Sequence, residues 1–294
     1  MMNKLTQKDG FWALIFLLPS VLGIMLFNLI PTVTSFYLSF TKWNLLGTPK
    51  FIGIGNYTGL FEDPLFFKVL FQTLYFVFAS VILEIIISLL IATALNSIVK
   101  FKSLYRTIYF LPVVSSMVAV AILWNWIFDP AYGLLNYILS FVGINPIFWL
   151  SDPTWALPSM IIVSVWKNLG YSVVLFLSGL QTLPQDCLEA ASVDGATKPQ
   201  TFYKVVIPLL SPTIFLVTIM SFINSFQTFD SVYILTAGGP ENSTNIMVYW
   251  LYKNAFEFYN MGKASAIAYV LFLIILTITM IQWYFRKKWV IYED

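Results

Sequence analysis

Long runs of apolar residues, separated by short polar segments, dominate the chain. Six runs are long enough to cross a bilayer, which takes about 20 mostly apolar residues of helix. They cover residues 11–36, 71–95, 108–128, 156–180, 205–229 and 264–285. The runs are continuous rather than alternating, and each is longer than the about 10 residues of a barrel strand. The pattern predicts an all-α polytopic membrane protein with six transmembrane helices, forming one domain over residues 1–294.

The composition leads to the same class of protein. Hydrophobic residues make up 59% of the chain and charged residues 10%, whereas a soluble domain has about 25% charged residues. The net charge of +2 gives no reason to expect a nucleic-acid partner. There is no histidine and one cysteine, Cys187, so an intrachain disulfide is excluded and the commonest general base and metal ligand are missing. We expect no catalytic residue, no metal site and no cofactor bound by this chain.

The basic residues predict the orientation, because cytoplasmic loops are enriched in Lys and Arg. Lys4 and Lys8 precede an apolar run that is too long for a signal peptide, so we expect a retained first span. An inside N-terminus places ten basic residues in the cytoplasm: Lys4, Lys8, Lys100, Lys102, Arg106, Lys198, Lys204, Arg286, Lys287 and Lys288. Five then lie outside: Lys42, Lys50, Lys68, Lys253 and Lys263. This bias predicts that both termini are cytoplasmic.

Two predicted outer loops contain short segments that resemble surface helices. Residues 130–150 include an amphipathic run without Lys or Arg, and residues 242–259 form a second such segment, with Ser243 or Thr244 as its N-cap. Two interpretations stay open for both loops. They pack against lipid headgroups, or they form a docking surface for a partner outside the cell.

One predicted cytoplasmic segment, residues 189–212, is polar and rich in small residues. Pro184 favours a helix start, and the helix over Gln185–Val193 is expected to end at Asp194-Gly195. Thr197 is a suitable cap for a second short helix. The pattern therefore predicts a helix-turn-helix over about residues 184–204. Its small residues permit close approach of a partner, although a capped loop without a partner fits the same residues.

The same segment carries a resemblance to a known family. Glu189-Ala190-Ala191, three residues, Gly195, nine residues and Val205-x-Ile207-Pro208 resemble the EAA loop of binding-protein-dependent ABC importer permeases, EAA-x3-G-x9-I-x-L-P. Val205 and Ile207 are conservative departures. Residues 122–136, 179–196 and 234–240 also resemble the carbohydrate-uptake branch, the maltose and glycerol-phosphate type. The resemblance covers nearly the whole chain, without the extra leading spans and large outer domain of the maltose-type subunit.

The resemblance implies a type I ABC importer permease in the bacterial inner membrane. It implies that Glu189, Ala190, Ala191, Asp194 and Gly195 form the coupling helix and its turn, which sit in a cleft of an ATPase subunit. The implied partners are a second permease subunit, two ATP-binding subunits that carry ATP and Mg, an extracellular or periplasmic sugar-binding protein, and membrane lipid. No G-x-x-x-x-G-K-[ST] motif occurs in the chain, so we expect a transport subunit rather than an enzyme.

Polar residues in the fifth and fourth spans suggest a substrate path. Ser221, Asn224, Ser225 and Thr228 follow helical spacing and form one stripe, which either faces a cavity or bonds a neighbouring helix. The resemblance matches Ser221, Ser225 and Thr228 to sugar-contacting positions, with Ser225 and Thr228 in place of asparagines. It also places Leu169, Gly170 and Val173 along the sugar path, with Val173 in place of an aromatic residue. Trp166 and Tyr171 suit stacking on a sugar, or are ordinary interface aromatics.

Two charged residues lie within predicted spans, Glu84 in the second and Lys167 in the fourth. Each costs about 2.5–3.5 kcal/mol at the bilayer centre on insertion scales, so we expect them to pair, or one of them to face a subunit interface. An alternative function is a secondary transporter that uses Glu84 and Asp230 as ion sites. A membrane-embedded enzyme would need a constellation of acid, base or metal ligands that the chain lacks. We favour a permease for a neutral sugar or oligosaccharide, since a phosphate ester would call for Arg.

Overall fold

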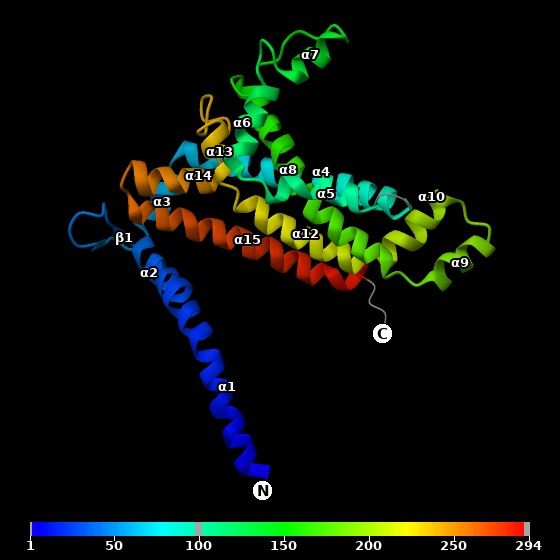
Figure 1. The fold of residues 1–294 in the computed structure, drawn as a ribbon. Coiled ribbons are helices and arrows are strands. Elements are labelled where there is room, and N and C mark those ends of the chain that lie inside the picture. The colour runs from blue at the N-terminus through cyan, green and yellow to red at the C-terminus, as the bar shows by residue number, and fades with distance from the viewer. Residues whose placement is uncertain (1, 98–101, 291–294) are drawn as a thin grey trace. The chain divides into compact units, whose positions relative to one another are not determined.

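The computed structural model describes residues 2–97 and 102–290, which are almost entirely helical (Figure 1). The described residues divide into two compact units. The first comprises the chain up to Pro64 together with Leu251–Val270, and the second comprises Leu65–Trp250 and the residues from Leu271 onward.

The first unit begins with helical segments of the predicted first span. Its elements are α1 (Met2–Ile24), the π-helical turn η1 (Met25–Leu29), α2 (Ile30–Ser39), β1 (Thr41–Lys42), β2 (Lys50–Phe51), α3 (Gly55–Phe61), the π-helical turn η3 (Lys253–Glu257) and the start of α15 (Met261–Trp289). β1 and β2 are antiparallel, with Thr41 opposite Phe51. The Asn56 amide donates to the carbonyl oxygens of Ser39 and Thr41, both at 2.8 Å. Gly262 lies so close to the Thr41 carbonyl that a Cβ there would collide with it.

The second unit contains the remaining helices. They are α4 (Pro64–Ser97), α5 (Lys102–Val114), α6 (Met117–Ile127), α7 (Leu134–Ser140), α8 (Pro153–Gln181), α9 (Gln185–Val193), α10 (Lys198–Thr201), the π-helical turn η2 (Phe202–Val206), α11 (Ile207–Leu209), α12 (Ser211–Phe226), α13 (Asp230–Leu235), α14 (Met247–Tyr252) and the rest of α15. α8 packs against both α5 and α12. Small residues permit this, because a Cβ at Gly170 would collide with the Tyr109 carbonyl and a Cβ at Gly179 would crowd Leu210.

Four helical segments are long and apolar enough to span a membrane: Ile15–Ser39, Pro64–Ser97, Pro153–Gln181 and Met261–Trp289. Each contains most or all of a predicted span. Two further predicted spans are broken rather than continuous, because α5 and α6 meet at a bend of 109° and the segment Lys198–Leu209 meets α12 at 68°. The described residues therefore hold four candidate spans, or six if each bent pair counts as one.

Proline explains both breaks. Pro112 lies inside α5, where it has no N–H to donate to the preceding turn, and the backbone leaves the helical region at Ser116. Pro208 and Pro212 flank the second bend at Leu210. Proline in a continuous apolar run is a sequence signal for a bend: Pro208 and Pro212 predict an opening or a bend of the fifth span, and the structure shows the bend.

The expected N-cap in the second outer loop is wrong. The helix α14 starts at Met247, and its first amide donates to the Thr73 hydroxyl of α4 at 2.9 Å. Thr244 is fully buried and donates to the Gly239 carbonyl at 2.8 Å instead. A tertiary contact thus supplies the cap that a local pattern assigned to a neighbouring residue.

A single buried amide organises the loop that contains α7. The Asn136 side chain donates to the carbonyl oxygens of Pro130 and Ile147, at 3.3 and 2.9 Å. Its oxygen accepts from the Ile147 amide at 3.1 Å and from the Trp149 indole at 3.0 Å. The two ends of the loop are therefore tied together through one side chain that is 6% exposed.

We expect Asn136→Ala to loosen residues 130–149 by about 1–3 kcal/mol, since it leaves buried backbone and indole groups unpaired. Hydrogen–deuterium exchange of the purified protein should show faster exchange over this loop alone. Asn44→Ala is the matched control, because Asn44 is exposed and accepts one local hydrogen bond from Leu46. Equal exchange in both variants would contradict this role of Asn136.

Candidate functional site

The predicted cytoplasmic segment forms two short helices, α9 and α10, joined by a tight turn. α9 follows Pro184 and ends in a Schellman motif, in which the amide of Ala196 donates to Ala191 at 3.0 Å and that of Gly195 donates to Ser192 at 3.1 Å. Gly195 has φ +77°, a conformation that other residues adopt with strain. A capping box between Thr197 and Gln200 starts α10. The turn is therefore fixed by local chemistry on both sides.

Most side chains of the helix α9 are exposed, although it contacts η2 and α10. None of its residues is buried. Glu189 and Ala190 are exposed, Ala191 is half-buried, and Val193 is 88% exposed. An exposed valine on a rigid, well-capped helix is suited to contact with another protein. Whether Glu189, Ala190, Ala191, Asp194 and Gly195 contact an ATPase stays a prediction.

A polar cavity of about 430 Å³ lies among α6, α8, α12 and α13. Its lining is rich in hydroxyl, amide and charged groups: Met117, Val163, Ser164, Lys167, Asn168, Asn224, Gln227, Thr228, Phe229, Asp230 and Ser231. α12 ends at Phe226 and α13 begins at Asp230, so the irregular connection between them supplies Gln227, Thr228 and Phe229 to the lining. Such an irregular segment at membrane depth is tolerated where it lines a cavity.

Two charged residues, Lys167 and Asp230, line the polar cavity. The Lys167 ammonium donates to the carbonyl oxygens of Pro112 and Ser115, at 3.3 and 2.9 Å. Asp230 is exposed at the first position of α13. Beside it, Ser231 is 6% exposed, and its hydroxyl has no hydrogen-bond partner within the described chain. The cavity lining thus includes a cation and an anion, together with a serine whose buried hydroxyl has no partner within the described chain.

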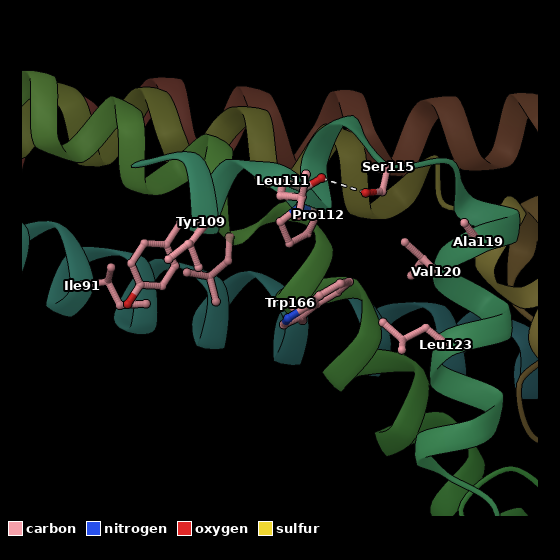
Figure 2. Close-up of a pocket in the computed structure, with 11 residues that line it drawn as sticks. Ile91, Tyr109, Leu111, Pro112, Ser115, Ala119, Val120, Leu123 and Trp166 are labelled. Atoms are coloured by element: carbon pink, nitrogen blue, oxygen red, sulfur yellow. Dashed lines mark hydrogen bonds between the residues drawn. The ribbon is translucent and has the colours of Figure 1, made fainter. Parts of the chain in front are cut away.

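A second, apolar cavity of about 560 Å³ lies against the bend between α5 and α6. Figure 2 shows Trp166 on α8 among residues of α5 and α6, with Ser115 donating to the Leu111 carbonyl at 2.8 Å. Leu169 lines the same cavity. Its walls are almost wholly aliphatic and aromatic, so it lacks the hydrogen-bonding groups that a sugar requires.

The predicted substrate-path residues therefore lie in three different environments. Asn224 and Thr228 line the polar cavity, whereas Trp166 and Leu169 line the apolar one. The remaining four are buried within the described fold: Gly170, Val173, Ser221 and Ser225. Sequence reasoning did not place Ser164, Asn168 or Ser231 on the path. A signal was available, since Asn168 directly follows Lys167 inside the fourth span and Ser231 directly follows Asp230 after the fifth.

The expected ion pair between Glu84 and Lys167 is wrong, because each side chain has other partners. Glu84 of α4 is 4% exposed, and its carboxylate accepts from the Ser172 hydroxyl of α8 at 2.5 Å and from the Ser221 hydroxyl of α12. Lys167 instead contacts backbone carbonyls. Each charge is satisfied by neutral hydrogen-bonding groups, which costs less than leaving it bare in an apolar interior. Glu84 thereby joins three helices.

A polar cavity among broken, apolar helices and, apart from it, an exposed pair of short capped helices are features of a membrane transport subunit. Residues 84–288 match the family model described as "Binding-protein-dependent transport system inner membrane component". The chain therefore belongs to this family of ABC importer permeases, which are multi-pass proteins of the plasma membrane. Glu84, which joins α4 to α8 and α12, lies at the start of the matched region.

Similar proteins agree with the family. The chain is 40% identical to "Probable ABC transporter permease protein YesP" of Bacillus subtilis, covering 99% of this chain and 96% of that protein. It is 32% identical to the "Trehalose/maltose transport system permease protein MalF" of Thermococcus litoralis, covering 95% of each. A solved bacterial ABC transporter that imports the acidic polysaccharide alginate matches with a TM-score of 0.84 at 21% identity, covering 98% of this chain and 99% of that chain. The similarity to the alginate transporter shows that this chain has the same fold.

The Glu84 junction predicts different costs for two buried serines. Ser172 and Ser80 are both 1% exposed, but Ser172 donates to Glu84 whereas the Ser80 hydroxyl has no partner in the described chain. We expect Ser172→Ala to lower the free energy of unfolding by about 1–2 kcal/mol, and Ser80→Ala to change it by less than about 0.5 kcal/mol. Thermal unfolding in detergent measures both. Equal midpoints would rule out a stabilising role for the junction.

Proposed function

We propose that this chain is one permease subunit of an ATP-driven importer for a neutral sugar or oligosaccharide. The observation that carries the substrate class is the polar cavity, whose hydroxyl, amide and carboxylate groups match the donors and acceptors of a polyhydroxyl ligand. Relatives such as the trehalose/maltose permease of Thermococcus litoralis are named for sugars, which supports the same class. Asn224 and Thr228 would contact the sugar directly.

The partners follow from the family and from what this chain lacks. A second permease would complete the transport path, and two ATPase subunits would hold ATP and Mg²⁺. A solved alginate transporter of the same fold was crystallised with a sugar-loaded periplasmic protein, which supports a solute-binding protein as a further partner. A chain without a P-loop contributes the path and the mechanical connection, while hydrolysis occurs elsewhere.

The topology we propose has six spans, with each bent pair crossing once and both termini in the cytoplasm. Ten basic residues on the cytoplasmic side against five outside support this orientation. Lys100 and part of its loop lie outside the described residues. α9 and α10 then face the cytoplasm, where the ATPase subunits bind.

The short helices α9 and α10 and the α12–α13 wall of the polar cavity belong to one continuous stretch of chain. α10 leads through η2 and α11 to the bend at Leu210, and α12 then runs to Asn224. We infer that closure of the ATPases moves α9 and α10, with Glu189 as the polar contact and Ala190 and Ala191 as the packing face. The bent span transmits that movement, and alternation between two states exposes the cavity to each side in turn.

A gradient-driven transporter is the weaker alternative. Of its two proposed ion sites, Asp230 lines the polar cavity, but Glu84 is buried among serines and lines neither cavity. The family match also favours an ATP-driven system.

Gly195 provides the test of coupling. Its φ of +77° is open to asparagine but strained for valine or proline, and no atom lies within 4 Å of a Cβ placed there. We expect Gly195→Asn to keep most of the ATP-driven uptake. Gly195→Val and Gly195→Pro should reduce it at least about tenfold, since the strain of about 1–2 kcal/mol displaces α10.

Uptake into proteoliposomes that contain the whole complex is the measurement. Membrane insertion and yield of all three variants should match the wild-type chain, which separates coupling from folding. Wild-type uptake in the valine and proline variants would refute the coupling role of this turn.

A further inference from the structure

We propose that Lys167 connects the substrate cavity to the break between α5 and α6, so that the bound sugar and the bend share one ammonium group. Lys167 is then a positioning residue for transport as well as a specificity determinant. The inference rests on the proposed function in treating the polar cavity as the sugar site.

The break between α5 and α6 exposes a stretch of backbone that needs hydrogen-bond donors. α5 ends at Val114 and α6 begins at Met117, with Ser116 in an extended conformation of ψ 138° between them. Carbonyl groups at the end of a helix lack partners in the next turn, and the hydrocarbon of a bilayer supplies no water to them. The Lys167 ammonium donates to the Ser115 carbonyl at 2.9 Å and to the Pro112 carbonyl at 3.3 Å, the second of which also accepts from the Ser115 amide at 3.3 Å. A cation is also favoured at the carbonyl end of a helix.

α8 packs closely against α5 next to Lys167. Three residues after Lys167, Gly170 lies so close to Tyr109 of α5 that a Cβ would collide with its carbonyl oxygen. α8 therefore contacts α5 at two levels, once by close backbone approach and once by the ammonium. The bend is kept at a fixed distance from α8, and only the ammonium contact involves a group that a ligand can also bind.

Lys167 also lines the polar cavity. Its ammonium has three N–H donors, of which two bond the carbonyls of Pro112 and Ser115. The third is available to an acceptor in the cavity. A ligand that takes this donor, or draws the ammonium toward itself, changes the two bonds at the break. Occupancy of the cavity and the angle of the bend are thereby linked through a single side chain.

The surrounding groups indicate the class of ligand. The exposed Asp230 carboxylate accepts hydrogen bonds, and the exposed amides of Asn224 and Gln227 both donate and accept them. One cation, one anion and several neutral groups suit a polyhydroxyl compound without net charge. A phosphate ester would meet the Asp230 carboxylate and find one lysine in place of an Arg cluster.

The experiment uses the complete importer in lipid nanodiscs and hydrogen–deuterium exchange, without and with maltotriose as a neutral polyhydroxyl probe. In Lys167→Met, which keeps the length of the stem, the amides of residues 115–120 should exchange at least fivefold faster than in the wild-type chain. Lys167→Arg should stay within twofold of the wild-type chain, since it restores the donors. Asn224→Ala is the control on the α12 wall of the same cavity, and without maltotriose it should leave exchange at residues 115–120 unchanged.

Maltotriose should slow exchange in the wild-type chain both at residues 224–231 and at residues 115–120. In Lys167→Met it should slow only the first segment, which a merely structural role would not produce. Unchanged exchange at the break in Lys167→Met, or slowing of both segments in that variant, would overturn the link. Absence of slowing anywhere in the wild-type chain would overturn the ligand class.

The failure of this inference is distinguishable from failure of the proposed function. ATP-driven uptake of a sugar by the wild-type complex, together with normal exchange in Lys167→Met, would leave the importer intact and remove only the role of the lysine. Absence of ATP-dependent transport would remove the proposed function itself.

Discussion

A broken helix in a bilayer must satisfy its own backbone, because hydrocarbon offers no hydrogen bonds to the carbonyls that the break leaves behind. This constraint determines much of the second unit. Pro112 lies in the last turn of α5, and the carbonyls of Pro112 and Ser115 accept hydrogen bonds from Lys167 of α8. A charge that would otherwise be costly at this depth is thereby stabilised by two acceptors. The same side chain borders the polar cavity, so the solution to a backbone problem also places a cation where a ligand would enter.

The second bend connects the two parts to which we assign roles in transport. On one side lie α9 and α10, whose turn is fixed by the Schellman motif at Gly195 and the capping box at Thr197. On the other side, the 16 residues of α12 span about 24 Å and end at the cavity. A rigid helix between a bend and a binding cavity transmits displacement better than a flexible loop would. The Glu84 junction, which ties α4 to α8 and α12 through two serines, keeps this helix in register with its neighbours.

The sequence was informative where local chemistry decides the structure. Long apolar runs located the membrane helices, and the spacing of Glu189, Gly195 and Pro208 indicated the family before any geometry was known. It was less informative where distant residues meet. The pattern of the fifth span grouped Ser221 with Asn224, but α4 places Glu84 against Ser221, which turns that serine inward. Likewise, opposite charges suggested a pair of Glu84 and Lys167, whereas serines and a helix break supply closer partners. The roles of the coupling and substrate-path residues remain predictions, because their partners are other molecules.

Co-purification followed by reconstitution tests the central claim most directly. The tagged chain, expressed with the products of its neighbouring genes, should bring along a second permease and an ATPase, and the purified complex should import sugar into proteoliposomes only when ATP and the binding protein are supplied. A chain that purifies alone and transports solute without ATP would contradict the account, and Glu84 would then become the first residue to study as an ion site.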